Sequence, residues 1–180
     1  MMAFGRGIVV IIDKNKPEKQ QRNQTGSPIL EEGDILLNTT LAETSDWQQV
    51  DLSVVSTLRH FCIETLSSYT EDNQACISEV DLLDDKGQPI DKTKWEVVYV
   101  SSEQADKNLG IAENLFDGDI SSFWHTDPAT EPGQPHRIIV DIKEIYKISA
   151  LRFKVRKGAF LSGKVKEINV YGRPQFFLFH

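Results

Sequence analysis

The chain has 180 residues, of which 39% are hydrophobic and 26% are charged, and its formal net charge is −7 at pH 7. This length and composition are typical of one folded domain with a sizeable core, and they exclude a disordered chain. The acidic balance disfavours nucleic acid and anionic lipid as partners, because both carry negative charge themselves.

The N-terminal part of the chain holds one short apolar run, within Gly7–Asp13. This run is too short for the hydrophobic part of a signal peptide or for a membrane span. We therefore expect the protein to stay in the compartment where it is made, cytoplasmic by default unless a leader has been removed. Residues 14–34 carry almost no apolar side chain, which predicts a long exposed loop.

The rest of the chain alternates short apolar runs, rich in Val, Ile, Phe and Tyr, with turn signals. No segment keeps a 3.6-residue period over ten residues, and only short helical turns are expected, near Ser45–Val54 and Ala112–Phe116. The pattern predicts an all-β sandwich that forms a single domain over residues 1–180. After the first run, the expected strands are Gly33–Leu37, Leu58–Leu66, Ile77–Leu83, Trp95–Val100, Arg137–Ile142, Ile148–Val155 and Val165–Tyr171. The short terminal run Phe176–Phe179 is expected to be an edge strand, and the alternative is an exposed apolar tail.

The two cysteines, Cys62 and Cys76, flank a predicted hairpin. They do not fall directly opposite each other in its register. A disulfide and a pair of buried free thiols are both compatible with this spacing.

The segment Asn114–Thr126 has the composition of a cation-binding loop. Asp117, Asp119 and Ser122 occupy positions one, three and six, and Gly118 permits a sharp turn. Oxygen ligands at such spacing are what a hard cation requires from one tight loop. The alternative is an ordinary solvated turn, because Asp and Gly are both common in turns.

The motif Asp-Gly-Asp-x-x-Ser-x-Trp-His-Thr, at residues 117–126, resembles the loop of the discoidin, or coagulation-factor type C, domain. This family has the galactose-binding-like fold and includes the family 32 carbohydrate-binding modules. The segments 135–142, 148–156 and 163–171 resemble the family's following strands. The resemblance implies a jelly-roll β-sandwich.

The order of the matching segments differs from that of the family. Residues 40–50, 57–64 and 75–83 resemble the end of such a domain, yet they precede the segments that resemble its beginning. We therefore predict a circularly permuted strand order, joined through the polar linker Asp84–Lys94, with the resemblance covering about residues 34–172. Such a change is tolerated because the termini of compact domains often lie close together.

The resemblance also implies a structural calcium ion. Its ligands on this chain would be the Asn114 carbonyl, the Asp117 and Asp119 carboxylates, Ser122, and Glu79 from a strand that the permutation moved forward. Three carboxylates with neutral oxygens suit Ca²⁺, which takes six to eight oxygen ligands.

Three further positions match the residues with which sugar-binding members of the family hold their ligand: Glu103, His125 and Arg156. An acid, an imidazole and a guanidinium together can donate to and accept from sugar hydroxyls. The family often has an aromatic residue three positions after the histidine, where this chain has Pro128. Phe160 could supply the stacking ring only if its loop folds inward. The alternatives are a histidine bonded to backbone and an arginine in a surface ion pair.

These features predict a non-catalytic, lectin-like module that binds galactose-type or related glycans, free or on glycoproteins, and is stabilised by calcium. The alternative is a protein–protein interaction module of the same fold without a sugar site. A membrane-binding discoidin role has less support, because the acidic chain offers few basic residues. No Gly-x-Ser-x-Gly nucleophile motif or phosphate-binding loop is present, so we do not expect an enzyme.

Overall fold

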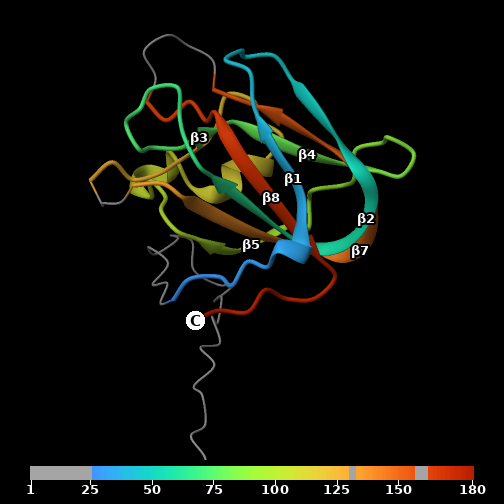
Figure 1. Cartoon of the computed structure of the whole chain (residues 1–180). Coiled ribbons are helices and arrows are strands. Elements are labelled where there is room, and N and C mark those ends of the chain that lie inside the picture. The colour runs from blue at the N-terminus through green and yellow to red at the C-terminus, as the bar shows by residue number, and fades with distance from the viewer. Residues whose placement is uncertain (1–25, 130–132, 157–161) are drawn as a thin grey trace, which may run out of the picture.

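Two long strands, β2 (Gln48–Thr65) and β7 (His136–Lys154), organise the fold of the computed structural model (Figure 1). The structure describes residues 26–129, 133–156 and 162–180. All the described strand pairs are antiparallel. The other strands are β1 (Ile35–Thr40), β3 (Cys76–Ile77), β4 (Glu79–Asp84), β5 (Glu96–Val100), β6 (Trp124–His125) and β8 (Glu167–Arg173).

The main sheet has the order β1-β8-β2-β7-β4, and β5 pairs with β7 as well. Strand β7 pairs with β2 on one side, while on the other side its two halves pair with β5 and β4. Bulges in β2 between Asp51 and Ser56, and between Leu58 and His60, interrupt its register with β7. Bulges bend and twist strands, so this long sheet can enclose a core.

The core gathers the apolar faces of these strands into one main cluster. Its largest fully buried side chains include Trp124, Phe61 and Phe153. Alternation along the strands explains this burial, since every second side chain points to the same face. No α-helix occurs in the described part of the chain, whose only helical elements are the 3₁₀ turns η1 (Glu32–Asp34), η2 (Asp106–Asn108) and η3 (Ala112–Phe116). The all-β prediction is therefore confirmed.

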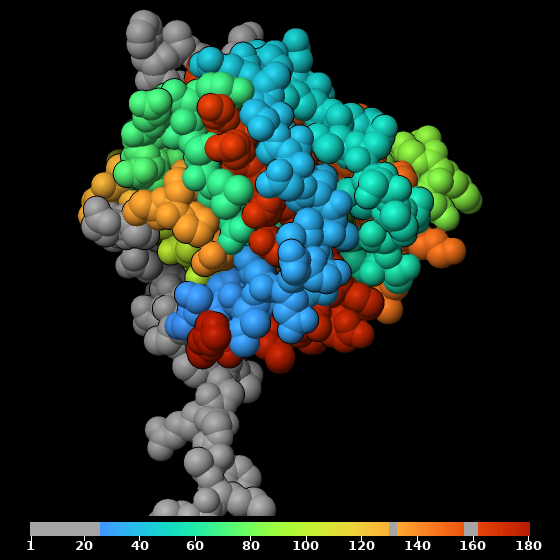
Figure 2. Space-filling model, viewed as in Figure 1, coloured from blue at the N-terminus to red at the C-terminus, as the bar shows by residue number. Residues whose placement is uncertain are grey.

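The ends of the described chain lie side by side. Ile29 N donates to Leu178 O at 2.7 Å, and His180 N donates to Ser27 O at 3.1 Å. Figure 2 shows the N-terminal part, in blue, next to the C-terminal end, in red, on one face of the molecule. None of the described helical segments is long and apolar enough to cross a membrane.

Three local predictions were wrong. The expected helical turn near Ser45–Val54 is strand from Gln48 onward, because Gln48–Asp51 pair with β7. The two strands expected at 137–142 and 148–155 form the single strand β7, in which Tyr146 still pairs with Leu58 across the polar connection. Phe176–Phe179 forms only an isolated bridge between Phe179 and Pro28.

The other local predictions have mixed outcomes. The turn at Ala112–Phe116 is confirmed as η3. The expected strand at Gly7–Asp13 and most of the expected loop at 14–34 lie outside the described residues. Cys62 and Cys76 are buried free thiols, so they do not form a disulfide.

Candidate functional site

The loop after η3 brings several oxygen atoms around the hydroxyl of Ser122. This hydroxyl lies 2.7 Å from Asp117 Oδ2, 2.9 Å from Asp119 O and 3.4 Å from Asn114 O. Gly118 has a φ of 81°, which allows the chain to turn back on itself here. Oxygens that share a calcium ion at 2.3–2.6 Å are themselves about 3 Å apart, so this spacing suits a cation.

The carboxylate of Asp119 does not face this cluster as the sequence predicted. It accepts hydrogen bonds from the Ser121 amide at 2.9 Å and the Ser121 hydroxyl at 2.6 Å. These bonds lower the pKa of Asp119. The backbone carbonyl of Asp119, rather than its carboxylate, lies beside Ser122.

Glu79, the first residue of β4, lies against the same loop. Its side chain is almost fully buried, and its Oε1 accepts a hydrogen bond from Gly118 N at 3.2 Å. Within the described residues, Glu79 Oε2 is buried without a hydrogen-bond partner. Burial raises the pKa of Glu79, although the Lys92 ammonium opposes the shift. A buried carboxylate oxygen without a partner is costly, so this atom is suited to a cation.

Lys92, which sequence reasoning missed, already compensates part of this charge. Its ammonium group contacts Glu79 Oε1 and donates to Asp81 Oδ1 at 2.6 Å and Val80 O at 3.2 Å. Lys92 comes from the linker before β5, which is otherwise mostly exposed. Among the described residues, no group of three or more His, Cys, Asp or Glu side chains is placed to hold a metal ion. Any cation here would depend on neutral oxygens as well as Asp117 and Glu79.

Of the three predicted sugar-binding residues, His125 lies within the motif, and Glu103 and Arg156 come from other parts of the chain. Glu103 Oε2 accepts a hydrogen bond from Ala112 N at 2.9 Å, so this carboxylate anchors the start of η3. His125 is buried in β6, and its Nδ1 is 2.5 Å from Thr126 O. Because a carbonyl only accepts, Nδ1 carries the proton, and in the uncharged tautomer Nε2 is an acceptor.

Arg156 follows the end of β7 and stacks on an aromatic ring. The guanidinium carbon lies 3.8 Å from the centroid of Phe123. The Phe123 ring in turn meets His125 edge-on, with centroids 6.5 Å apart. The backbone also joins Glu103's neighbour Gln104 to His125, through an N–H···O bond of 2.8 Å. Arg156, Phe123 and His125 are thus contiguous, whereas the Glu103 carboxylate turns toward η3.

Sequence reasoning did not identify Phe123 as the aromatic partner of Arg156, although its position beside Trp124 indicated an aromatic ring near His125. Trp124 is fully buried and donates from Nε1 to Ser102 O at 3.0 Å, so only Phe123 of this pair is accessible. The candidate stacking residue, Phe160, lies outside the described residues. Pro128, the position where the family often has an aromatic, is exposed.

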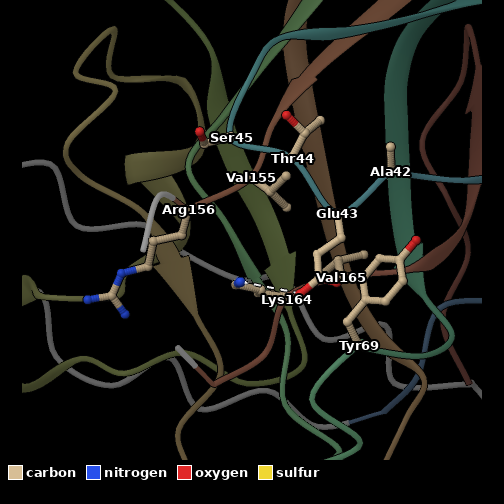
Figure 3. A pocket seen from close by; sticks show the side chains of 9 residues that line it. All are labelled: Ala42, Glu43, Thr44, Ser45, Tyr69, Val155, Arg156, Lys164 and Val165. Atoms are coloured by element: carbon tan, nitrogen blue, oxygen red, sulfur yellow. Dashed lines mark hydrogen bonds and ion pairs between the residues drawn. The ribbon is translucent and has the colours of Figure 1, made fainter. Parts of the chain in front are cut away.

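A pocket of about 200 Å³ lies beside Arg156 (Figure 3). Its walls come from the loop after β1, from Tyr69, and from Val155 and Val165. Lys164 and Glu43 form an ion pair across it, with Nζ and Oε1 3.4 Å apart. Sequence reasoning did not single out any of these residues.

The geometry describes an antiparallel β-sandwich whose connecting loops carry the polar groups. Residues 97–175 match the family model of the F5/8 type C domain. The resemblance to the discoidin family is therefore confirmed over this segment. Domains of this type are generally non-catalytic modules, and the family includes carbohydrate-binding modules.

The chain is also similar to a sialidase from Micromonospora viridifaciens. The two sequences are 33% identical over 84 residues, which is 46% of this chain. The aligned segment spans only 13% of the sialidase. The similarity therefore concerns one part of that enzyme.

Proposed function

We propose that this protein is a non-catalytic module that binds galactose-type or related glycans. The observation that carries the proposal is the contiguous row of Arg156, Phe123 and His125 at one end of the sandwich. Stacking on Phe123 fixes the plane of the guanidinium, so its N–H donors are already oriented for sugar hydroxyls. In its uncharged tautomer, His125 Nε2 would supply an acceptor, and the similarity to one part of a sialidase supports a glycan ligand.

The test is a titration of galactose and N-acetylgalactosamine, followed by a glycan array. We expect a dissociation constant on the order of 0.1–1 mM for one monosaccharide, because each hydrogen bond to the sugar replaces one to water. Arg156→Ala should abolish measurable binding. Arg152→Ala is the matched control, since Arg152 pairs with Asp81 and stacks on Trp47 instead. If the wild type binds no glycan on the array, the proposal is rejected.

We also propose that a structural calcium ion joins the loop to β4. Asn114 and Asp119 carbonyls, Asp117 Oδ2, Ser122 Oγ and the unpartnered Glu79 Oε2 are the donors that support it. The ion would supply positive charge for Glu79 and Asp117 and would cross-link two distant parts of the chain. It has no role in a reaction.

The circularly permuted strand order remains part of this proposal. Strand β4 lies next to β7 through the pairs Glu79↔Lys154 to Asp84↔Ile148, and the linker after it contains the exposed residues Asp85–Pro89. An exposed turn is where two ancestral termini could be joined at little cost.

A protein-interaction module is the second candidate. It is favoured by exposed apolar side chains in the C-terminal segment, where Phe176, Leu178 and Phe179 are 58%, 62% and 40% exposed. Apolar residues gathered on a surface mark contact sites for other proteins. A negative glycan array combined with a loss of partner binding in Phe176→Ser would favour this candidate.

A further inference from the structure

The pocket beside Arg156 carries more positive than negative charge, although the whole chain has a net charge of −7. Arg156 and Lys164 line it, and Lys154 donates to the carbonyl of the lining residue Ser45 at 2.7 Å. Lys166 adds a fourth cation, 5.7 Å from the ring of Tyr69, which is another lining residue.

The acidic groups near these cations include Glu43 and Asp46. Glu43 lines the pocket, and Asp46 accepts a hydrogen bond of 3.3 Å from the hydroxyl of Thr44. The residues that line the pocket thus carry two cations, Arg156 and Lys164, and one acid, Glu43, which gives a locally positive lining on an acidic protein. Such a lining attracts anionic groups of a ligand more strongly than neutral ones.

In the ion pair between Lys164 and Glu43, a ligand anion can replace the Glu43 carboxylate. The Lys164 side chain is 20% exposed and the Glu43 side chain is 54% exposed, and their separation is 3.4 Å. Because the Glu43 side chain is largely exposed, water screens the pair, and such pairs contribute little to stability. In Figure 3 the Lys164 ammonium points to Glu43 across the pocket, while the Arg156 guanidinium points away from both. Arg156 therefore stands between the pocket and Phe123.

We propose that this pocket is a second subsite, which binds the acidic group of a sugar adjacent to the one held by Arg156. This inference rests on the proposed glycan-binding function. Lys164 would exchange the Glu43 carboxylate for a ligand carboxylate or sulfate, since an ammonium group bonds either anion well. The pocket volume of about 200 Å³ is smaller than that of sites for drug-sized ligands, and it suits one ring or its substituent.

The aliphatic and aromatic walls of the pocket fit the rest of such a sugar. Val155 and Val165 are buried and present apolar surface, and the Tyr69 hydroxyl is fixed by donation to Leu41 O at 2.7 Å. A rigid ring and apolar walls pack against the C–H face of a pyranose without a large entropic cost. The ligand class is therefore a glycan with an acidic residue, such as a hexuronic acid or a sulfated hexose, next to a neutral galactose-type residue.

The experiment compares three disaccharides that share a non-reducing galactose and carry galactose, a hexuronic acid or a sulfated galactose as the second ring. For the wild type in about 50 mM salt, we expect the hexuronate or sulfate form to bind about five- to tenfold more tightly than the neutral form. This preference should fall toward unity in about 1 M salt, where the Debye length is about 3 Å.

Two substitutions on opposite sides of the ion pair should act in opposite directions. Lys164→Gln should remove the preference for the acidic disaccharides and leave binding of the neutral one unchanged. Glu43→Gln should increase the preference by several-fold, because the internal competitor is gone. Lys147→Gln, at an exposed lysine of β7 outside the pocket lining, is the matched control and should change neither. Unchanged melting temperatures would verify that all variants fold.

The outcomes separate this inference from the proposed function. Equal affinity for the neutral and acidic disaccharides, or a preference that survives Lys164→Gln, overturns the subsite while the glycan-binding function stands. Binding of an acidic disaccharide that depends on Lys164 but not on Arg156 supports the subsite and rejects the Arg156 site. Failure of all three ligands to bind at millimolar concentration overturns both.

Discussion

Gly118 N donates to Glu79 Oε1 at 3.2 Å, although the two residues are 39 positions apart in the chain. This bond places the turn of the candidate cation-binding loop directly on the buried start of β4. The two-stranded sheet of β3 and β6 joins the same two parts of the chain, through the pairs Cys76↔His125 and Ile77↔Trp124. A substitution at Glu79 should therefore affect the loop as strongly as one within the loop itself.

The proposed calcium site predicts a stability change on chelation. A ligand at a hundredfold excess over its dissociation constant stabilises the folded state by about 2.7 kcal/mol. For a chain of this size, that corresponds to a melting temperature about 5–10 °C lower after EDTA than with calcium. Differential scanning fluorimetry with and without EDTA measures it.

Asp117→Asn should abolish this calcium dependence, because it removes the carboxylate that faces Ser122. Asp85→Asn, at an exposed position of the linker, is the control and should retain it. A wild-type melting curve that EDTA leaves in place would contradict the calcium proposal.

Lys92→Met should destabilise the calcium-free protein by about 3 kcal/mol, because it leaves the buried Glu79 without its counter-charge, whereas Asp81 keeps its ion pair with Arg152. Urea unfolding of the EDTA-treated variant measures this difference. If the calcium proposal holds, added calcium should restore more stability to the variant than to the wild type, since the ion would then replace the lost Lys92 charge beside Glu79.

Lys94→Met is the matched control for this experiment. The Lys94 side chain is 74% exposed and lies 3.9 Å from Glu144, so its loss should change stability by less than about 1 kcal/mol. Equal effects of the two substitutions would show that the Lys92 contacts contribute little.

Because His60 is buried, we expect the protein to lose stability in mild acid. His60 is buried beneath Phe176, with ring centroids 4.2 Å apart, and its Nε2 lies 3.5 Å from Asp141 Oδ1. Burial lowers the pKa of His60, an effect that nearby Asp141 opposes. The unfolded state therefore binds the proton more readily, so this contribution is complete above about pH 6.5 and is lost as the pH falls.

His60→Phe should flatten the dependence of unfolding free energy on pH between about 7 and 5. A second acid-sensitive contribution is separate from this one. Burial raises the pKa of Asp141, but its bonds with Arg59 and Lys143 dominate and lower it to about 2, so its stabilisation is lost only below about pH 4. An identical pH slope in wild type and His60→Phe between pH 7 and 5 would refute the assignment to His60.

Short-range patterns predicted the elements well where burial alternates along a strand. Strands β5 and β8 and the turn η3 fall close to their predicted positions because apolar alternation and turn residues bound them clearly. The connection through Lys143–Lys147 was missed because its residues are mostly polar. Pairing with β2, which no local pattern encodes, keeps Tyr146 and Lys147 in the strand.

The candidate site was predictable by residue type but not by orientation. The sequence placed Glu79 against the loop by resemblance, and the hydrogen bond to Gly118 N agrees with that proximity. It could not foresee that Asp119 would turn its carboxylate to Ser121, or that Lys92 would contact Glu79, because both depend on rotamers and on long-range packing. The ion pair between Lys164 and Glu43 could not be predicted for the same reason, since 121 positions separate the two residues.

The proposed permutation predicts that the strand order can be reversed without loss of the fold. The variant would begin at Ile90, continue to His180, pass through a short Gly/Ser linker to Gly26, and end at Asp84. His180 N already donates to Ser27 O at 3.1 Å, so the new linker would span a short distance. The opened segment, Asp85–Pro89, is exposed and contributes little burial.

We expect this rearranged protein to fold with a stability within about 2 kcal/mol of the original, since nearly all strand pairs remain and each doubling of a flexible loop costs only about 0.6 kcal/mol. The control opens the chain inside β7, between Ile139 and Val140, where both residues are buried and paired with β2. That variant should not fold. Circular dichroism and urea unfolding distinguish the two, and a rearranged protein as unfolded as the control would contradict the permuted order.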